Sequence, residues 1–344
     1  PPNPVARPAR RTETMPTKGP HPLPLSYTCS SPLTSDSACR ANTFQPHTHV
    51  GTSNAAWGPG PWSYSGGVPP RRNPVLITGC STGIGRASAD LLVKAGYTVY
   101  ATARRPETLA ELAVAGAQTL ALDVTDERSM VAAVREVERA HGSVGTLINN
   151  AGYGEYGPIE ETDLDAVRKM FETNVFGLAR MTQLVLPGMR AVGSGLIVNI
   201  GSMGGRITFP IGGYYHATKY AVEGITDALR NEVRSFGIDV ALIEPGAIRT
   251  QFEETVNTAA GVANPDSPYA DLVAKVRSVN ADAYSSKVLS AGPENVAKTV
   301  LKVLESDPPR ARYLVTAAAR TMVNARRLGG DLVWDAIIAR QFSR

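Results

Sequence analysis

The chain has 344 residues, 43% hydrophobic and 19% charged, which fits one large α/β domain with an additional segment. Seven of its 35 Lys and Arg residues and two of its 31 Asp and Glu residues lie in residues 1–73, so the remainder holds 28 basic and 29 acidic residues. That near-neutral remainder argues against a nucleic-acid groove, and the three scattered cysteines of the chain argue against a disulfide framework or a bound metal and favour a cytoplasmic location.

The first element in chain order is an N-terminal segment rich in proline. Residues 1–73 contain more than half of the 25 prolines, and we expect this segment to be disordered and to lie outside the fold. No apolar run follows Arg10 and Arg11, so we expect neither a secretory nor a twin-arginine signal. No stretch of the sequence is long and apolar enough to predict a transmembrane helix.

From Val75 onward, short aliphatic or β-branched runs alternate with longer amphipathic stretches. This alternation predicts a doubly wound Rossmann fold over residues 74–316, α/β in class, with a seven-stranded parallel sheet flanked by helices. The predicted strands are Val75–Thr78, Thr98–Ala103, Gln118–Leu122, Thr146–Asn149, Leu196–Ile200, Val240–Glu244 and Arg312–Val315. The predicted helices are Gly85–Ala95, Glu127–His141, Leu164–Val192, Tyr215–Ser235 and Glu294–Ser306.

Two segments depart from this alternation. The connection at about residues 251–290 is far longer than a usual crossover, and we expect it to form a lid. Residues 317–344 mix apolar side chains with arginines and predict a C-terminal helical extension. That extension could cap the domain or contact another subunit, and a membrane-surface helix is the less favoured alternative.

A glycine-rich turn follows the first predicted strand and opens the first predicted helix. Glycines in such a turn let the backbone approach a pyrophosphate, whose negative charge is attracted by the free amides of the helix N-terminus. The alternative is a plain tight connection. The residues expected to contact a dinucleotide in this turn are Gly79, Ser81, Thr82, Gly83, Ile84 and Gly85.

The ends of the next two predicted strands indicate which dinucleotide fits. The second strand runs into Arg104 and Arg105 without the acid that usually binds the ribose hydroxyls, so a 2′-phosphate could pair with a guanidinium group. This predicts NADP(H) rather than NAD(H), although the arginines could merely solvate a loop. Asp123, with Val124, follows the third strand, where it could bind the adenine amino group, cap a helix, or do both.

The fourth predicted strand leads into four small or amide residues at the carboxyl edge, where open α/β sheets bind ligands. We expect Asn150, Ala151 and Gly152 to contact the cofactor. Asn149 could make such a contact or tie neighbouring loops together.

Tyr215 and Lys219 are four residues apart and therefore share one face of a predicted helix. An ammonium group beside a phenol lowers the pKa of the phenol, which suits the phenol to proton transfer. The alternative is an exposed helix face. Ser202, at the end of the fifth predicted strand, could bind a carbonyl oxygen, and Asn174 could hold a water that relays protons to Lys219.

These residues, in this order, resemble the compact branch of the short-chain dehydrogenase/reductase family over about residues 74–306. The resemblance implies hydride transfer between a nicotinamide and a carbonyl or alcohol, with Tyr215 as the acid or base. It rests on Thr78–Gly85, Asn149–Gly152, Ser202, Tyr215, Lys219, Pro245, Gly246 and Thr250. The catalytic residues that it implies are Asn174, Ser202, Tyr215 and Lys219.

Further contacts follow from the same resemblance. Tyr215 and Lys219 would also contact the cofactor, and Ser202 and Tyr215 would bind the substrate. The residues that would wrap around the nicotinamide carboxamide are Pro245, Gly246, Ile248 and Thr250. Relatives of this kind commonly pair their long helices, which implies a homodimer or a homotetramer.

The residues near the catalytic edge predict an apolar ketone or alcohol as substrate. The apolar and aromatic residues concerned are Tyr153, Tyr156, Met203, Phe209 and Phe252, although each could simply be part of the core. The run Tyr100–Leu109 is most similar to the branch that contains 17β-hydroxysteroid and retinol dehydrogenases, which implies a steroid-like or retinoid-like compound. Two other functions stay open: a non-catalytic NADP(H)-binding sensor or scaffold of the same fold, and a docking role for the Pro-rich segment.

Overall fold

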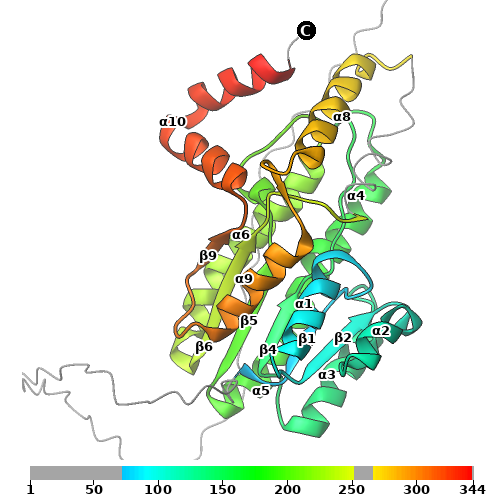
Figure 1. Cartoon of the computed structure of the whole chain (residues 1–344), viewed down its shortest axis with the longest axis vertical. Coiled ribbons are helices and arrows are strands. Elements are labelled where there is room, and N and C mark those ends of the chain that lie inside the picture. The colour runs from blue at the N-terminus through cyan, green and yellow to red at the C-terminus, as the bar shows by residue number, and fades with distance from the viewer. Residues whose placement is uncertain (1–71, 252–265, 343–344) are drawn as a thin grey trace, which may run out of the picture. The chain divides into compact units, whose positions relative to one another are not determined.

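The computed structural model describes residues 72–251 and 266–342, which belong to one compact unit. Its centre is a sheet of seven strands in the order β3-β2-β1-β4-β5-β6-β9, and every neighbouring pair is parallel (Figure 1). The predicted seven-stranded parallel sheet is therefore confirmed. The strands are β1 (Val75–Ile77), β2 (Val99–Ala103), β3 (Gln118–Ala121), β4 (Thr146–Asn149), β5 (Gly195–Ile200), β6 (Ile238–Glu244) and β9 (Arg312–Leu314).

Helices cover both faces of the sheet because the strands bury side chains on both sides. Val75 and Ile77 of β1 join an apolar cluster with Ala89 of α1 and Val300 of α9, two helices that lie side by side (Figure 1). Leu76, between them, belongs to a second cluster built on α3, α5 and α6. The helices concerned are α1 (Gly83–Lys94), α3 (Glu127–His141), α5 (Leu178–Val192), α6 (Gly213–Val233) and α9 (Pro293–Glu305). Such two-sided burial is typical of parallel sheets.

Helix α3 has the predicted bounds, because each of its ends carries a local signal. The side chain of Asp126 precedes the helix and accepts a hydrogen bond from the Arg128 N–H at 3.1 Å. Gly142 follows the helix with a φ of 84°, which a glycine adopts without strain.

The stretch predicted as one helix over Leu164–Val192 is interrupted in the structure. It consists of α4 (Leu164–Phe171), a π-helical turn η3 (Glu172–Gly177) and α5. Gly177 passes so close to the loop after β3 that a Cβ there would lie 2.6 Å from the Val124 carbonyl oxygen. Isolated π turns inside α-helices are frequent at functional sites, and this one contains Asn174.

Other elements were not predicted from periodicity. They are α2 (Ala110–Val114), the strand pair β7 (Ala247–Ile248) and β8 (Ser290–Ala291), and α8 (Ala270–Ser285). The segment predicted as a lid thus contains a helix and a short strand, and residues 252–265, with the predicted pocket residue Phe252, lie outside the described residues. Helix α10 (Ala317–Phe342) occupies the segment predicted as a helical extension.

The folded unit includes two residues that we assigned to the N-terminal segment. Arg72 is only 1% exposed, and its guanidinium donates hydrogen bonds to the Gly195 carbonyl at 3.2 Å and to Asp239 at 2.7 Å. Thr146 Oγ1 donates to the Arg72 carbonyl oxygen at 2.8 Å, and Asn73 Oδ1 accepts from the Thr98 N–H. Arg72 therefore ties the start of the fold to β4, β5 and β6.

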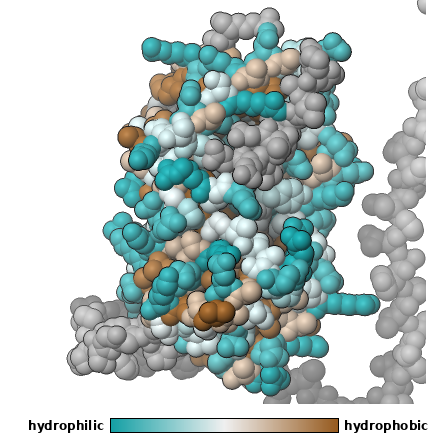
Figure 2. Space-filling view, turned by 45° about the vertical axis from the view of Figure 1, so that its right-hand side comes forward, coloured by the Kyte–Doolittle hydropathy of each residue, from teal (hydrophilic) through white to brown (hydrophobic). Residues whose placement is uncertain are grey.

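The face of the molecule drawn in Figure 2 is mainly hydrophilic. Figure 2 shows one face of the molecule, on which hydrophilic side chains predominate and hydrophobic ones form small separate areas. Apolar side chains are instead buried between the sheet and its helices. Within residues 72–251 and 266–342, no helix has both the length and the apolar character needed to cross a membrane.

Candidate active site

A cavity of about 1270 Å³ lies along the carboxyl edge of the sheet. Its walls come from the turns after β1 to β6 and from α8 and α10. Open α/β sheets bind ligands at this edge where the strand order reverses, which here is between β1 and β4. The predicted site residues that line it are Gly79, Ser81, Thr82, Gly83, Ile84, Arg104, Asp123, Val124, Asn150, Ala151, Gly152, Ser202, Tyr215, Lys219, Pro245, Gly246, Ile248 and Thr250, whereas Gly85 and Asn174 lie behind this layer.

The glycine-rich turn has the shape of a phosphate cradle. Gly79 and Gly83 have φ values of +74° and +59°, which side-chain-bearing residues rarely adopt. A Cβ on Gly85 would lie 2.3 Å from the Gly79 carbonyl oxygen, so the first turn of α1 packs directly on the loop. The bare backbone and the amides of the helix N-terminus fit a pyrophosphate.

Asn150 and Asn149 have different roles. Asn150 Nδ2 donates hydrogen bonds to the carbonyl oxygens of Thr78 and Gly79, each at 2.9 Å, and thereby ties the turn after β4 to the glycine-rich turn. Asn149 is 3% exposed and donates to Asn199 Oδ1 of the neighbouring strand at 3.0 Å. Of the two roles open for Asn149, the structure therefore shows the tie between neighbouring elements.

The turns after β2 and β3 present opposite charges to the cavity. Arg104 and Arg105 are exposed and line it, and β2 ends without a carboxylate. Oδ1 of Asp123 accepts hydrogen bonds from the backbone and the hydroxyl of Thr125 at 2.9 and 2.8 Å. Because Asp126 caps α3, the capping role that was open for Asp123 falls to another residue.

Tyr215 and Lys219 lie on successive turns of α6 and face the cavity. Their exposed fractions are 6% and 8%, which excludes the exposed helix face considered from the sequence. The Tyr215 hydroxyl shares a hydrogen bond with Ser202. Ser202 Oγ also accepts a hydrogen bond from the Gly204 N–H at 3.0 Å, which fixes its position at the end of β5.

Burial governs the ionisation of this pair. It raises the pKa of Tyr215 to about 12, an effect that the hydrogen bond with Ser202 only partly offsets, and it lowers the pKa of Lys219 to about 8. The sequence predicted that Lys219 would lower the pKa of Tyr215, and that prediction is wrong for the net effect. Lys219 Nζ lies 5.9 Å from the centroid of the Tyr215 ring and donates to the Ile200 carbonyl oxygen at 3.1 Å. Because its pKa is about 12, the phenol of Tyr215 is protonated at neutral pH.

Asn174 lies in the π-helical turn, and its side chain makes three hydrogen bonds. Its Oδ1 accepts from the Tyr153 N–H at 3.0 Å, and its Nδ2 donates to the Tyr153 carbonyl oxygen at 2.8 Å and to Thr218 Oγ1 at 3.1 Å. A Cβ on Gly152 would lie 3.0 Å from the same Oδ1. The side chain of Asn174 thus ties the turn after β4 to α6, and its predicted water-holding role stays a prediction.

His216 positions the site, although the sequence analysis assigned it no role. Its Nε2 accepts a hydrogen bond from the Phe209 N–H at 3.1 Å, so Nδ1 carries the proton and donates to the Gly204 carbonyl oxygen at 3.0 Å. Burial lowers the pKa of His216 to about 4, which keeps the ring neutral. His216 thus holds both the peptide segment beside Ser202 and the segment of Phe209, which lines the cavity.

The part of the cavity beyond Tyr215 is lined largely by aromatic and aliphatic side chains. Of the pocket residues predicted from the sequence, Tyr153, Tyr156, Met203 and Phe209 line it. The ring centroids of Tyr156 and Tyr215 are 5.4 Å apart, so this wall begins at Tyr215. The residues that α8 and α10 contribute to the cavity were not predicted, because these helices are far from β4 and β5 in the chain. These residues include Val276, Met322 and Phe342.

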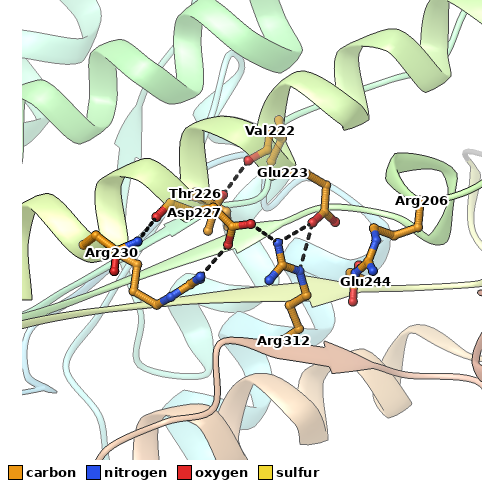
Figure 3. A network of polar contacts seen from close by, with 10 residues as sticks. Arg206, Val222, Glu223, Thr226, Asp227, Arg230, Glu244 and Arg312 are labelled. Atoms are coloured by element: carbon orange, nitrogen blue, oxygen red, sulfur yellow. Dashed lines mark hydrogen bonds and ion pairs between the residues drawn. The ribbon is translucent and has the colours of Figure 1, made fainter. Parts of the chain in front are cut away.

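A partly buried network of charges surrounds the end of β6 (Figure 3). Glu244, fully buried at the end of β6, lies beside Glu223 of α6. Arg206 contacts Glu244 at 3.4 Å, and Arg312 contacts Glu223 at 2.9 Å. One oxygen on each glutamate, Oε2 of Glu244 and Oε1 of Glu223, has no donor in the described part of the chain, and a proton shared between them would satisfy both.

Comparisons with known proteins agree with this geometry. A family model described as short chain dehydrogenase matches residues 73–261. The uncharacterized oxidoreductase YbbO of Escherichia coli (strain K12) is 36% identical over 265 residues, which cover 77% of this chain and 93% of that protein. A short-chain dehydrogenase from Streptomyces avermitilis superposes with a TM-score of 0.65 at 33% identity and covers 78% of this chain and 98% of its own.

Two further solved structures contain a cofactor. ElxO with NADP bound has a TM-score of 0.60 and 25% identity, over 73% of this chain and 99% of its own. A short-chain dehydrogenase/reductase from Burkholderia phymatum in complex with NAD has a TM-score of 0.64 and 26% identity, over 76% and 95%. The chain therefore belongs to the short-chain dehydrogenase family, as an NAD(P)-dependent oxidoreductase that acts on CH–OH groups.

Proposed function

We propose that this chain is an NADP(H)-dependent oxidoreductase that interconverts an apolar ketone and its alcohol, with Tyr215 as the acid or base. The observation that carries the proposal is the hydrogen-bonded pair of Tyr215 and Ser202 in the cavity that also contains the phosphate cradle. A non-catalytic sensor would need the cradle but not this pair.

The side chains divide the acid–base work among them. Bound nicotinamide would supply or accept the hydride. Tyr215, protonated at neutral pH, would donate its proton to the carbonyl oxygen during reduction, and Ser202 would hold that oxygen by a hydrogen bond. Lys219, beside Gly152 and the Tyr215 ring, is placed to hold the nicotinamide ribose and to favour the phenolate electrostatically.

The supports for NADP(H) lie at the end of β2. Arg104 and Arg105 line the cavity there, and their guanidinium groups match the charge and geometry of a 2′-phosphate. Asp123 and Val124 line the cavity after the next strand, where an adenine would lie. Since one solved relative contains NADP and another NAD, the preference rests on these residues of the chain itself.

An apolar substrate is supported by the cavity wall beyond Tyr215. That wall is formed largely by aromatic and aliphatic side chains from four segments, which favour the burial of apolar groups, although Asn280, Asp282 and Gln341 also line the cavity. Together with the sequence resemblance over Tyr100–Leu109, it favours a steroid-like, retinoid-like or long-chain ketone. Pro245, Gly246, Ile248 and Thr250 would close around the carboxamide on the opposite side.

We also propose a homodimer or homotetramer that pairs α4 and α5 with α6. Exposed apolar side chains on α4, on α6 and on the π-helical turn η3 support it, since Leu164, Tyr220 and Phe176 are 52%, 45% and 55% exposed. A molar mass in solution equal to that of one chain would contradict this arrangement.

The substitution Tyr215→Phe tests the proposed function. It removes the proton donor and keeps the ring, so we expect NADPH to bind nearly as before while carbonyl reduction falls by about three orders of magnitude or more. NADPH binding can be followed by fluorescence and turnover by loss of NADPH absorbance.

Tyr214→Phe is the matched control, because the Tyr214 hydroxyl donates to the Ile159 carbonyl oxygen and lies outside the cavity lining. It should keep full turnover. Retained turnover in the Tyr215 variant would contradict the mechanism, and NADPH binding without turnover of any carbonyl by the wild type would favour the sensor.

A further inference from the structure

Helix α10 is bent in its middle. Gly330 has a φ of 64° and a ψ of −161°, whereas the residues on either side of it are helical, so residues 317–329 and 331–342 form two helical halves (Figure 1). A positive φ of this size is accessible to glycine without strain. The bend lets the second half turn back toward the substrate side of the cavity, where Gln341 and Phe342 line it.

One face of the second half of α10 packs against the rest of the folded unit. Trp334, Ile337 and Ile338 follow the spacing of a helical stripe and pack in a cluster with Phe209 and Met322. Trp334 is 4% exposed, and its ring centroid lies 5.7 Å from that of Phe209. The opposite face is unpacked, since Leu332 is 87% exposed. This docking fixes the position of the last turn of the helix.

Phe342 is the continuation of that stripe at the cavity. It packs on the buried side chains of Ile211, Val273 and Val276 together with Tyr156. The Phe342 and Phe209 ring centroids are 6.5 Å apart. Since the Tyr156 ring also stacks at 5.4 Å from Tyr215, Phe342 closes an aromatic wall that starts at the catalytic tyrosine.

We propose that Phe342 is a specificity-determining residue, the end wall that limits the length of the alkyl group on the substrate carbonyl. This inference rests on the proposed function, because it assumes that a carbonyl compound reacts at Tyr215. Each methylene group that the apolar pocket buries should favour binding about fourfold. Once the alkyl chain reaches the ring of Phe342, a further carbon must displace packed side chains and is disfavoured.

The test is a series of straight-chain methyl ketones of increasing length, reduced at saturating NADPH. For the wild type we expect kcat/KM to rise with length, pass an optimum and fall. Phe342→Ala should move the optimum to longer ketones by about two carbon atoms or more, and Phe342→Trp should move it to shorter ones. The shift should be carried by KM, while kcat for the shortest ketones stays within about twofold.

Leu332→Ala, on the exposed face of the same half-helix, is the matched control and should leave the optimum in place. Phe342→Leu serves as a milder variant if the alanine variant does not fold. An optimum that is the same in the wild type and in all Phe342 variants overturns the inference while the proposed function stands. No turnover of any ketone by the wild type, despite NADPH binding, overturns the proposed function and this inference with it.

Discussion

Glu244, at the carboxyl end of β6, holds a proton in the native state that the unfolded chain would release. Burial and the neighbouring Glu223 raise the pKa of Glu244 to about 8, although Arg206 and Arg312 act in the opposite direction. Because the native state binds the proton more tightly, this group stabilises the fold most below about pH 4.5. That contribution is lost as the pH rises toward 8.

We therefore expect Glu244→Gln to change the pH dependence of stability. The amide cannot ionise and can donate to Glu223, so the variant should gain stability relative to the wild type by about 1 kcal/mol or more between pH 6 and pH 9. Urea denaturation at both pH values measures the difference. Glu305→Gln, an exposed acid at the end of α9, should show no such change. A difference independent of pH would mean that the buried pair does not share a proton.

Arg104 offers a test of the proposed preference for NADP(H). Arg104→Ala removes a cation from the end of β2, so the dissociation constant of NADPH should rise about tenfold, with that of NADH nearly unchanged. Titration of both nucleotides measures the ratio. The double variant with Arg105→Ala completes the test, because either arginine lines the cavity. An unchanged NADPH/NADH ratio in the double variant would contradict the preference for NADP(H).

Elements that carry their own signals were predicted well. Strands β1, β2, β4, β5 and β6 follow short apolar runs, and α3 has both a capping aspartate, Asp126, and a terminating glycine, Gly142. The π-helical turn around Asn174 was not predicted; Gly177 at its end passes close to Val124, a contact between segments that are distant in the chain. The periodicity of apolar residues carries no signal for a contact with a segment that is distant in the sequence.

The candidate site likewise contains features that the sequence predicted and features that it did not. The glycine-rich turn and the pair of Tyr215 and Lys219 are local patterns, and the sequence predicted their place in one cavity. The net pKa of Tyr215 was predicted in the wrong direction, since burial by surrounding elements raises it more than the hydrogen bond with Ser202 lowers it. His216 and Phe342 were missed for a related reason: their roles depend on segments that meet only in the folded chain.

The folded unit begins before residue 74, the start that we predicted from the sequence. The proposal that residues 1–73 are an appendage is supported by their proline content and charge, but Arg72 and Asn73 make hydrogen bonds to residues of the folded unit. The buried guanidinium of Arg72 bonds to the Gly195 carbonyl and to Asp239, so its removal leaves a buried acceptor without its donor.

Two truncations separate the segment from its anchor. Deleting residues 1–62 should leave both turnover and the free energy of unfolding unchanged within about 0.5 kcal/mol, because the catalytic groups and Arg72 all remain. Deleting residues 1–73 should cost about 2–3 kcal/mol, and Arg72→Ala in the full chain should reproduce most of that loss. Urea denaturation and NADPH-dependent turnover measure both quantities. If the shorter deletion abolished turnover, the Pro-rich segment would be part of the enzyme, and if it abolished only the capture of a partner, docking would be its role.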